Sequence, residues 1–199
     1  MKLLLAATIV LMLSAIAIAV PDSKQLGPYI VSFDLNANYQ PQIRQSIENE
    51  EVNAYGIGLF VDNSTFATIE VAEYVEPQDA TLNVHKNIMG LKMLLGGLNV
   101  TNVEDKTING KEGFLVTTVP SQAEIGAPST IYRAMYWLDS QGCECGPVSI
   151  GKTSVVITST YPLDITESLL SSLQIVKGEA AASAQPAPTT QGGQVLPPA

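Results

Sequence analysis

Two cysteines, Cys143 and Cys145, are the residues of this chain best suited to redox or metal chemistry. They are its only cysteines, and a single glutamate separates them between Gly142 and Gly146. Two thiols at this spacing can close a small disulfide, cross-link two chains or bind a metal, although structural zinc sites have four Cys or His ligands. The pattern predicts a disulfide or thiol pair in a loop, leaves a metal ligand role open and indicates no cofactor.

A second motif, residues 146–153, carries the letters of a phosphate-binding loop, Gly-x-x-x-x-Gly-Lys-Thr. In such loops a strand precedes the glycines and a helix follows the lysine, so that backbone amides and the helix dipole meet the phosphate. Here the β-branched run 154–158 follows Lys152 and favours a strand. The motif is therefore predicted to be a loop that connects strands and binds no nucleotide.

The chain has one histidine, His85, and the sequence places no serine, cysteine or carboxylate partner beside it. Acid–base and nucleophilic catalysis both need such a partner within hydrogen-bond reach. Calcium binding by Glu48, Glu50 and Glu51 stays open, although their spacing is not that of an EF-hand and fits a solvated surface better. We therefore expect a protein that is not an enzyme.

Two tripeptides, Asn63-Ser-Thr and Asn99-Val-Thr, match the acceptor pattern for N-glycosylation. Each is expected at a turn, where a bulky sugar is tolerated. Asn63 and Asn99 are thus candidate glycosylation sites in an exported protein.

The first 19 residues have the pattern of a secretory signal peptide. Lys2 gives a positive start, residues 3–13 form an apolar run, and residues 17–19 provide a small-x-small cleavage site. The apolar run is short for a membrane span, and no basic cluster follows it. The sequence predicts a signal peptide over 1–19, a linker over 20–26, and a mature protein that is secreted or at the cell surface, extracellular or periplasmic, with no stable membrane span.

The remaining composition separates a domain from a tail. Residues 178–199 are rich in Ala, Pro, Gln and Gly, and they contain too little apolar surface to offset the entropy of ordering, so this segment is expected to be disordered. Residues 27–177 have the size of a single domain. The formal net charge is −9, which disfavours binding to nucleic acid or to anionic lipid.

Periodicity predicts two helices. Residues 77–97 place Val84, Ile88, Leu91 and Leu95 on one stripe, with Asp79 as the cap and Gly96-Gly97 as the stop. We expect this stripe to be buried against a sheet. Residues 162–176 carry a second stripe, formed by Ile165, Leu169, Leu173 and Val176, behind a capping box of Asp164 and Glu167.

Alternating or β-branched runs predict the strands. These runs are 29–35, 55–61, 66–74, 100–108, 113–119, 131–138 and 154–161. Asn109-Gly110 is a hairpin signal, because both central positions of a type I′ turn have positive φ. Gly56 and Gly58 leave one face of their strand open to close approach by another layer, and 36–53 is expected to be mostly loop. The predicted class is α+β, an antiparallel sheet of about six or seven strands packed with two main helices.

This order of elements, with the hairpin lead Ile108–Phe114 and the closing helix 165–176, resembles the PsbP-like fold over roughly residues 27–177. The segment Gly27–Asp34 is also similar to small exported archaeal proteins of unknown function. PsbP-like domains are mostly non-enzymatic accessory or binding modules, so the resemblance implies a binding role. Plant members bind calcium or manganese, but the resemblance assigns none of their ligand positions to a residue of this chain.

These observations favour an exported, non-enzymatic binding or structural protein of the cell envelope or extracellular space. Its partner would be an envelope protein or a small ligand. Two alternatives stay open: a thiol-redox or metal-binding module that uses Cys143 and Cys145, and a soluble carrier with a pocket between sheet and helix. A deep cleft with several ionisable groups would favour an enzyme, an apolar cavity a carrier, and a flat exposed patch an interaction protein.

Overall fold

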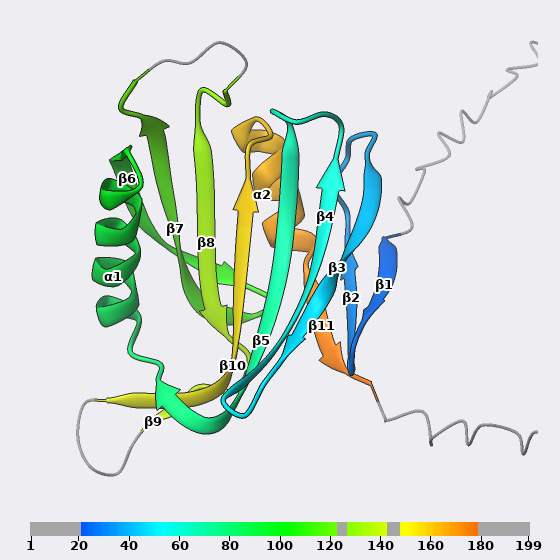
Figure 1. Ribbon diagram of the computed structural model, residues 1–199, viewed down its shortest axis with the longest axis vertical. Helices are drawn as coiled ribbons and strands as arrows, with labels where there is room; N and C mark the ends of the chain where they lie inside the picture. Colours follow the sequence, from blue (N-terminus) through cyan, green and yellow to red (C-terminus); the bar gives the residue numbers. More distant parts are fainter. Residues whose placement is uncertain (1–20, 123–126, 143–147, 179–199) are drawn as a thin grey trace, which may run out of the picture.

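The structure is a computed structural model, and it describes residues 21–122, 127–142 and 148–178. Figure 1 shows a large twisted sheet with a helix on each side and a small second sheet. The elements are β1 (Asp22–Leu26), β2 (Tyr29–Phe33), β3 (Gln40–Glu48), β4 (Val52–Phe60), β5 (Phe66–Asp79), α1 (Leu82–Leu95), β6 (Leu98–Ile108), β7 (Lys111–Pro120), β8 (Ile131–Trp137), β9 (Gln141–Gly142), β10 (Ser149–Ser159), α2 (Leu163–Ser172) and β11 (Gln174–Lys177).

The large sheet has the strand order β3-β4-β5-β10-β8-β7-β6, and the short β9 pairs with β10. Each described pair of strands is antiparallel. Strand β10 lies at the centre, where Ile157 faces Ile69 of β5 on one side and Ala134 of β8 on the other. The predicted α+β class, with an antiparallel sheet and two helices, is confirmed.

A three-stranded sheet of order β1-β2-β11 was not predicted. Residues 22–26, expected to belong to a linker, form β1 and turn at Gly27 into β2. The end of the predicted second helix is β11, because Leu173 leaves helical geometry at φ −61° and ψ 126°. Ile175 of β11 is buried, whereas Val176 points outward, so Val176 does not belong to the buried stripe.

Strand β3 corrects the prediction that residues 36–53 are mostly loop. Its side chains are largely exposed, so it lacks the alternation that marks a half-buried strand. It forms because its backbone pairs with β4, for example Ile43 with Ile57, at the edge of the sheet. A bulge interrupts this ladder between Arg44 and Ile47.

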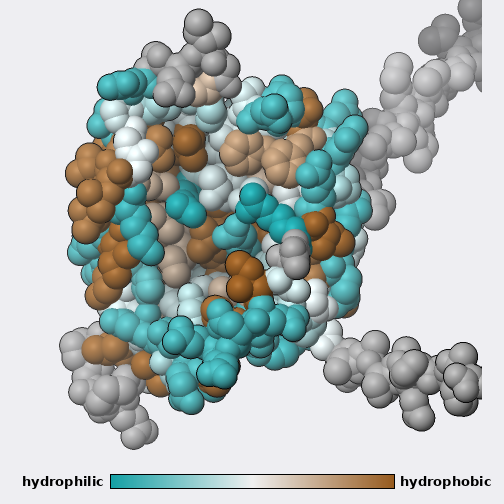
Figure 2. Space-filling view, viewed as in Figure 1, coloured by the Kyte–Doolittle hydropathy of each residue, from teal (hydrophilic) through white to brown (hydrophobic). Residues whose placement is uncertain are grey.

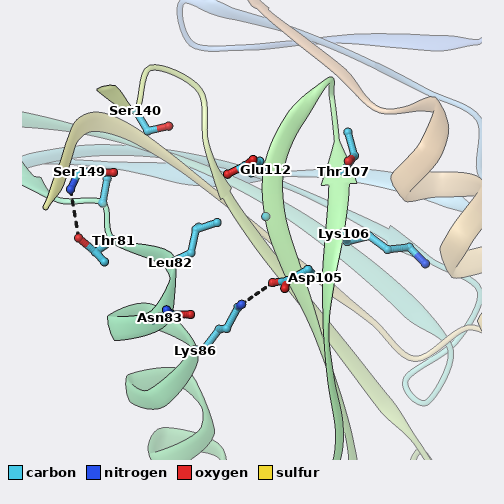
Figure 3. A pocket seen from close by; sticks show the side chains of 12 residues that line it. Thr81, Leu82, Asn83, Lys86, Asp105, Lys106, Thr107, Glu112, Ser140 and Ser149 are labelled. Atoms are coloured by element: carbon cyan, nitrogen blue, oxygen red, sulfur yellow. Dashed lines mark hydrogen bonds and ion pairs between the residues drawn. The ribbon is translucent and has the colours of Figure 1, made fainter. Parts of the chain in front are cut away.

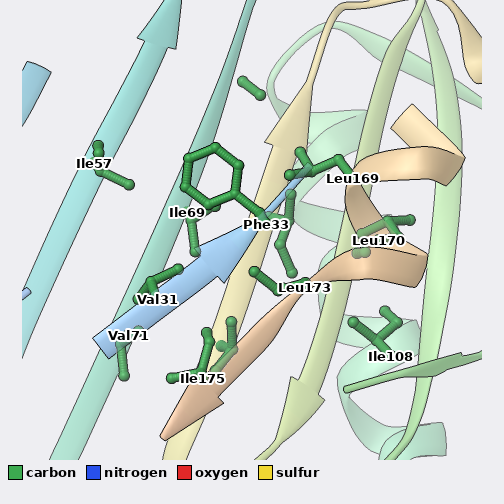
Figure 4. Packing of buried hydrophobic residues seen from close by; sticks show 14 of the residues in the cluster. Val31, Phe33, Ile57, Ile69, Val71, Ile108, Leu169, Leu170, Leu173 and Ile175 are labelled. Carbon is green, nitrogen blue, oxygen red and sulfur yellow. The ribbon is translucent and has the colours of Figure 1, made fainter. Parts of the chain in front are cut away.

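On one face of the large sheet, the central strands are covered. Helix α2 and the small sheet pack there on the inward side chains of the central strands, which together form the main core (Figure 4). Leu169, Leu170 and Leu173 are the helix's contribution. The predicted capping box is wrong: Pro162 occupies the N-cap position without a side-chain bond, and Glu167 instead pairs with Lys106 at 2.7 Å.

Helix α1 packs on the opposite face, over β6 and β7 (Figure 1). Its buried residues are Met89 and Met93, which join a second cluster with Phe114, Val116, Met135 and Trp137. The predicted stripe was wrong, because all four of its residues are exposed; they are Val84, Ile88, Leu91 and Leu95. Their spacing is helical, but their side chains stay exposed, whereas Met89 and Met93 pack on the sheet.

The ends of α1 are partly as predicted. Gly97, at φ +78°, stops the helix, as the Gly96-Gly97 pair indicated. The N-cap residue is Thr81, and the Asp79 carboxylate accepts a hydrogen bond from the Thr81 amide (2.8 Å) rather than from the first helical turn. The Asn109-Gly110 hairpin is confirmed, with φ +52° and +68° joining β6 to β7.

Neither helix in the described part of the chain has the length and apolar composition needed to cross a membrane.

Candidate functional site

The face of the large sheet that carries α1 is only partly covered. Helix α1 lies at one side of this face, over β6 and β7, and no other described element packs on the face of β4, β5 and β10 (Figure 2). The strands alternate accordingly: Ile69 and Val71 of β5 are buried on the covered face, whereas Glu70 and Ala72 turn to the open one. The open face is therefore the part of the sheet available to a partner or a ligand.

A groove crosses this open face from α1 to β3, and we call it the sheet-face groove. Two adjoining cavities make it up, with volumes of about 310 Å³ at the α1 end and about 450 Å³ at the β3 end. Both are lined by Tyr74, Ser154 and Val156, which lie on the neighbouring strands β5 and β10. These three residues form the middle of the groove.

The α1 end of the groove lies between helix and sheet. Apolar side chains, those of Ile88, Met89 and Met135, line it together with three nitrogen-bearing side chains, those of His85, Lys92 and Arg133. Arg133 reaches this face from β8, where Val116 and Thr158 are its neighbours on the adjacent strands. This end combines an apolar wall with a cluster of basic groups.

His85 is held against the sheet rather than free. Its Nε2 lies 2.5 Å from the backbone carbonyl oxygen of Asp79, and its ring centroid lies 5.5 Å from that of Trp137. Tyr74 flanks the same indole at 5.9 Å. Since a backbone carbonyl rather than a nucleophile or a carboxylate occupies Nε2, His85 is arranged to position this wall of the groove.

The β3 end has a floor of small residues, Ala54, Gly56 and Ala72. Arg44 and Glu70 form an ion pair of 3.0 Å across Gly56, which faces both of them in the strand register. The expectation that another layer approaches Gly56 and Gly58 is not met within the described residues. At Gly58 the ring of Phe60 already fills the space, because a Cβ there would lie 2.1 Å from it.

A larger cavity, of about 550 Å³, lies at the N-terminal end of α1 (Figure 3). Its basic groups are already occupied. Lys86 forms an ion pair with Asp105. The Lys106 side chain points toward α2, and its pairs with Glu167 of α2 and Glu104 of β6 raise the pKa of its ammonium group. The two lysines of this cavity are therefore not free to select an anionic ligand, and its Glu112 carboxylate forms no ion pair with a described residue.

The thiol pair predicted from the sequence, Cys143 and Cys145, lies outside the described residues. Lys152 lies within β10 and donates a hydrogen bond to the backbone oxygen of Val75 (2.8 Å), and the strand continues to Ser159. A helix therefore does not follow the lysine, as a phosphate-binding loop would need. The prediction that 146–153 is a connecting loop is wrong for residues 149–153, because they already belong to strand β10.

The two candidate glycosylation sites are exposed, but only one is at a turn. Asn63 lies in the β4–β5 turn, where Asp62 accepts hydrogen bonds from Ser64 and Thr65; these bonds lower the pKa of its carboxyl group. Asn99 is the second residue of β6 rather than a turn residue. Glu48, Glu50 and Glu51 do not converge: within the described residues no three His, Cys, Asp or Glu side chains are placed to share a metal ion.

Most residues of the sheet-face groove were not singled out by the sequence. Arg133 gave the clearest signal, because it is the only charged residue in the otherwise aromatic and apolar strand β8. Tyr74 and Val156 gave none, since aromatic and β-branched residues are ordinary in strands. The groove became visible only once the strand order brought β5, β8 and β10 together.

No family model matches the chain, and no curated protein matches it with significant similarity. The resemblance to the PsbP-like fold stays a prediction, and the function is inferred from the site itself.

Proposed function

We propose that this chain is an exported, non-enzymatic binding protein of the cell envelope or extracellular space, and that the sheet-face groove is its binding site. Support for export comes from the signal-like segment with Lys2 and the apolar run that follows. The proposal of a binding role rests on one observation: a groove that begins under α1 continues over a sheet face which no described element covers.

The chemistry of the groove supports binding over catalysis. Ligand sites are mostly apolar concavities with a few placed polar groups, and the α1 end has this composition. The ionisable side chains of the groove that have described partners use them structurally: Glu70 pairs with Arg44, and His85 contacts the Asp79 carbonyl. Ser154 and His85 line the same cavity, but within the described residues no hydrogen bond joins this hydroxyl to the imidazole, as an activated nucleophile would need.

Within this function, a carrier of a small ligand is favoured over a structural partner. The cavity of about 310 Å³ lies between sheet and helix, and its size falls at the lower end of the range for small-molecule sites. The thiol-redox or metal-binding alternative depends on Cys143 and Cys145, and no described residue supports it.

The test is to fill the groove and measure binding of a neutral apolar probe, N-phenyl-1-naphthylamine, by its fluorescence. Val156→Phe places a larger side chain where the two cavities meet. The matched control is Val176→Phe, the same exchange at an exposed strand position on β11. We expect Val156→Phe to raise the Kd for the probe about tenfold, equivalent to about 1.4 kcal/mol, and the control to leave it unchanged.

The proposal fails if the wild-type protein does not bind the probe saturably. It also fails if the two variants bind equally well while both unfold cooperatively, because the probe would then be bound elsewhere.

A further inference from the structure

Five of the nine basic residues in the described part of the chain have carboxylate partners. With 19 acidic and 10 basic residues, carboxylates are abundant, and five basic residues form ion pairs within 4.0 Å. The other four, Lys92, Lys111, Arg133 and Lys152, form no ion pair with a described carboxylate, and of these Lys92 and Arg133 line the α1 end of the sheet-face groove. His85, the chain's one histidine, lines the same cavity.

Arg133 differs from Lys92 in that part of its side chain is buried in the sheet. Its Nε is buried and has no hydrogen-bond partner among the described residues. A buried donor without an acceptor is costly, and more so on a charged group. Arg133 also lines the cavity, and its planar guanidinium can donate two parallel hydrogen bonds to one carboxylate that binds there.

Apolar side chains lie in the same cavity as these basic groups. Ile88, Met89, Met135 and Val156 line the same cavity, with Tyr74 at its junction with the β3 end. A ligand complementary to this end therefore has an apolar body and one anionic head.

We propose that the α1 end of the groove binds a single anionic amphiphile, with its carboxylate or similar oxyanion at Arg133 and Lys92 and its apolar body against Met135 and Val156. This inference rests on the proposed function and specifies its ligand class. The charge of the chain favours a free amphiphile as the source, because a net charge of −9 opposes docking onto an anionic membrane surface.

The experiment compares two probes with the same aromatic body. N-phenyl-1-naphthylamine is neutral, whereas 8-anilinonaphthalene-1-sulfonate adds an anionic head. We expect Arg133→Gln to raise the Kd for the sulfonate probe about tenfold or more and to change the Kd for the neutral probe less than about twofold, because only the charge-assisted hydrogen bonds are lost. Lys92→Gln, at an exposed helix position where folding is not at risk, should act in the same direction with a smaller effect.

The matched control is Lys111→Gln, which removes an exposed positive charge beside the β6–β7 turn, outside the groove. It should leave both affinities unchanged, because overall charge is not what selects the sulfonate. In competition, dodecanoate should displace the sulfonate probe at lower concentration than dodecanol from the wild type, and this preference should disappear in Arg133→Gln.

The outcomes separate the two proposals. If the neutral probe binds and Val156→Phe blocks it, but Arg133→Gln and Lys92→Gln do not change the sulfonate preference, the ligand class is wrong and the binding function stands. If neither probe binds the wild type, the binding function itself is refuted. If truncation after Gly178 strengthens binding of both probes equally, the tail occupies the groove. If the protein cosediments with phosphatidylglycerol vesicles and Arg133→Gln abolishes this, the anionic group belongs to a membrane lipid. Either result contradicts a free amphiphile as the ligand.

Discussion

Alanine substitution of one buried and one exposed residue of α1 measures which side of the helix packs on the sheet. Met93 is 3% exposed and packs in the cluster of Phe114 and Val116, whereas Leu95 is 79% exposed. Buried Met→Ala exchanges cost about 2–5 kcal/mol through lost apolar burial and the cavity left behind. Because the cluster borders the open groove and can partly relax, we expect about 3 kcal/mol for Met93→Ala and less than about 0.5 kcal/mol for Leu95→Ala.

Urea denaturation followed by tryptophan fluorescence is the appropriate measurement. Trp137 is the single tryptophan of the chain and lies in the same cluster as Met93, so its emission reports loss of this packing. With a slope of about 2 kcal/mol per molar urea, the Met93→Ala midpoint should fall by about 1.5 M. A larger loss for Leu95→Ala than for Met93→Ala would refute this orientation of the helix and restore the stripe predicted from the sequence.

Two further perturbations test the backbone and the charge of particular turns. Gly27→Ala should lower the free energy of unfolding more than Gly110→Ala, as measured by urea denaturation. Both glycines have positive φ, which costs an alanine about 1 kcal/mol, but only at Gly27 would the new Cβ lie 2.3 Å from the Tyr55 ring. Equal losses in the two variants would contradict the packing of the β1–β2 turn on β4. Asp62→Asn should flatten the acid limb of the stability curve. Hydrogen bonds in the turn lower the pKa of the Asp62 carboxyl group. The charged carboxylate therefore stabilises the fold above the unfolded-state pKa of about 3.9, and this stabilisation is lost as the pH falls through the lower folded-state pKa. An unchanged acid limb would show that the charged form contributes nothing.

Elements fixed by local backbone geometry were predicted correctly. The Asn109-Gly110 turn and the Gly97 helix stop both depend on positive φ, which few residues adopt, so the residue type itself determines the structure. Strands β4, β5 and β7 also followed from their alternating or β-branched residues, because such runs suit strands that have one face, or in β7 both faces, in a hydrophobic core.

The orientation of α1 could not be predicted in this way. The residues at 84, 88, 91 and 95 and those at 82, 86, 89 and 93 have the same helical spacing, and an offset of two residues turns one stripe about 200° from the other. The first stripe is the more hydrophobic, yet the structure buries Met89 and Met93 of the second. Side-chain fit to Phe114 and Met135 selects the methionines, since their flexible side chains fill irregular gaps, and this fit depends on strands distant in sequence.

Strand β3 illustrates a second limit. An edge strand with exposed side chains gains its stability from backbone pairing with β4, and no periodicity in its own residues records that pairing. Strands β1 and β11 also lie at the edges of their sheet, and both depend on pairing with β2 between them.

The sheet-face groove depends on both the orientation of α1 and the pairing of strands distant in sequence, and no local motif records either of them. Its basic wall requires α1 to turn its methionine side to the sheet, because that orientation brings His85 and Lys92 to the same cavity as Arg133. Its floor requires β10 to lie between β5 and β8, so that Val156 faces Glu70 on one side and Met135 on the other. Had the predicted stripe been buried instead, Lys92 would lie on a different side of the helix, and Arg133 would have lost its basic neighbour. The Met93 and Leu95 variants thus test the orientation of α1 on which the proposed anion site depends.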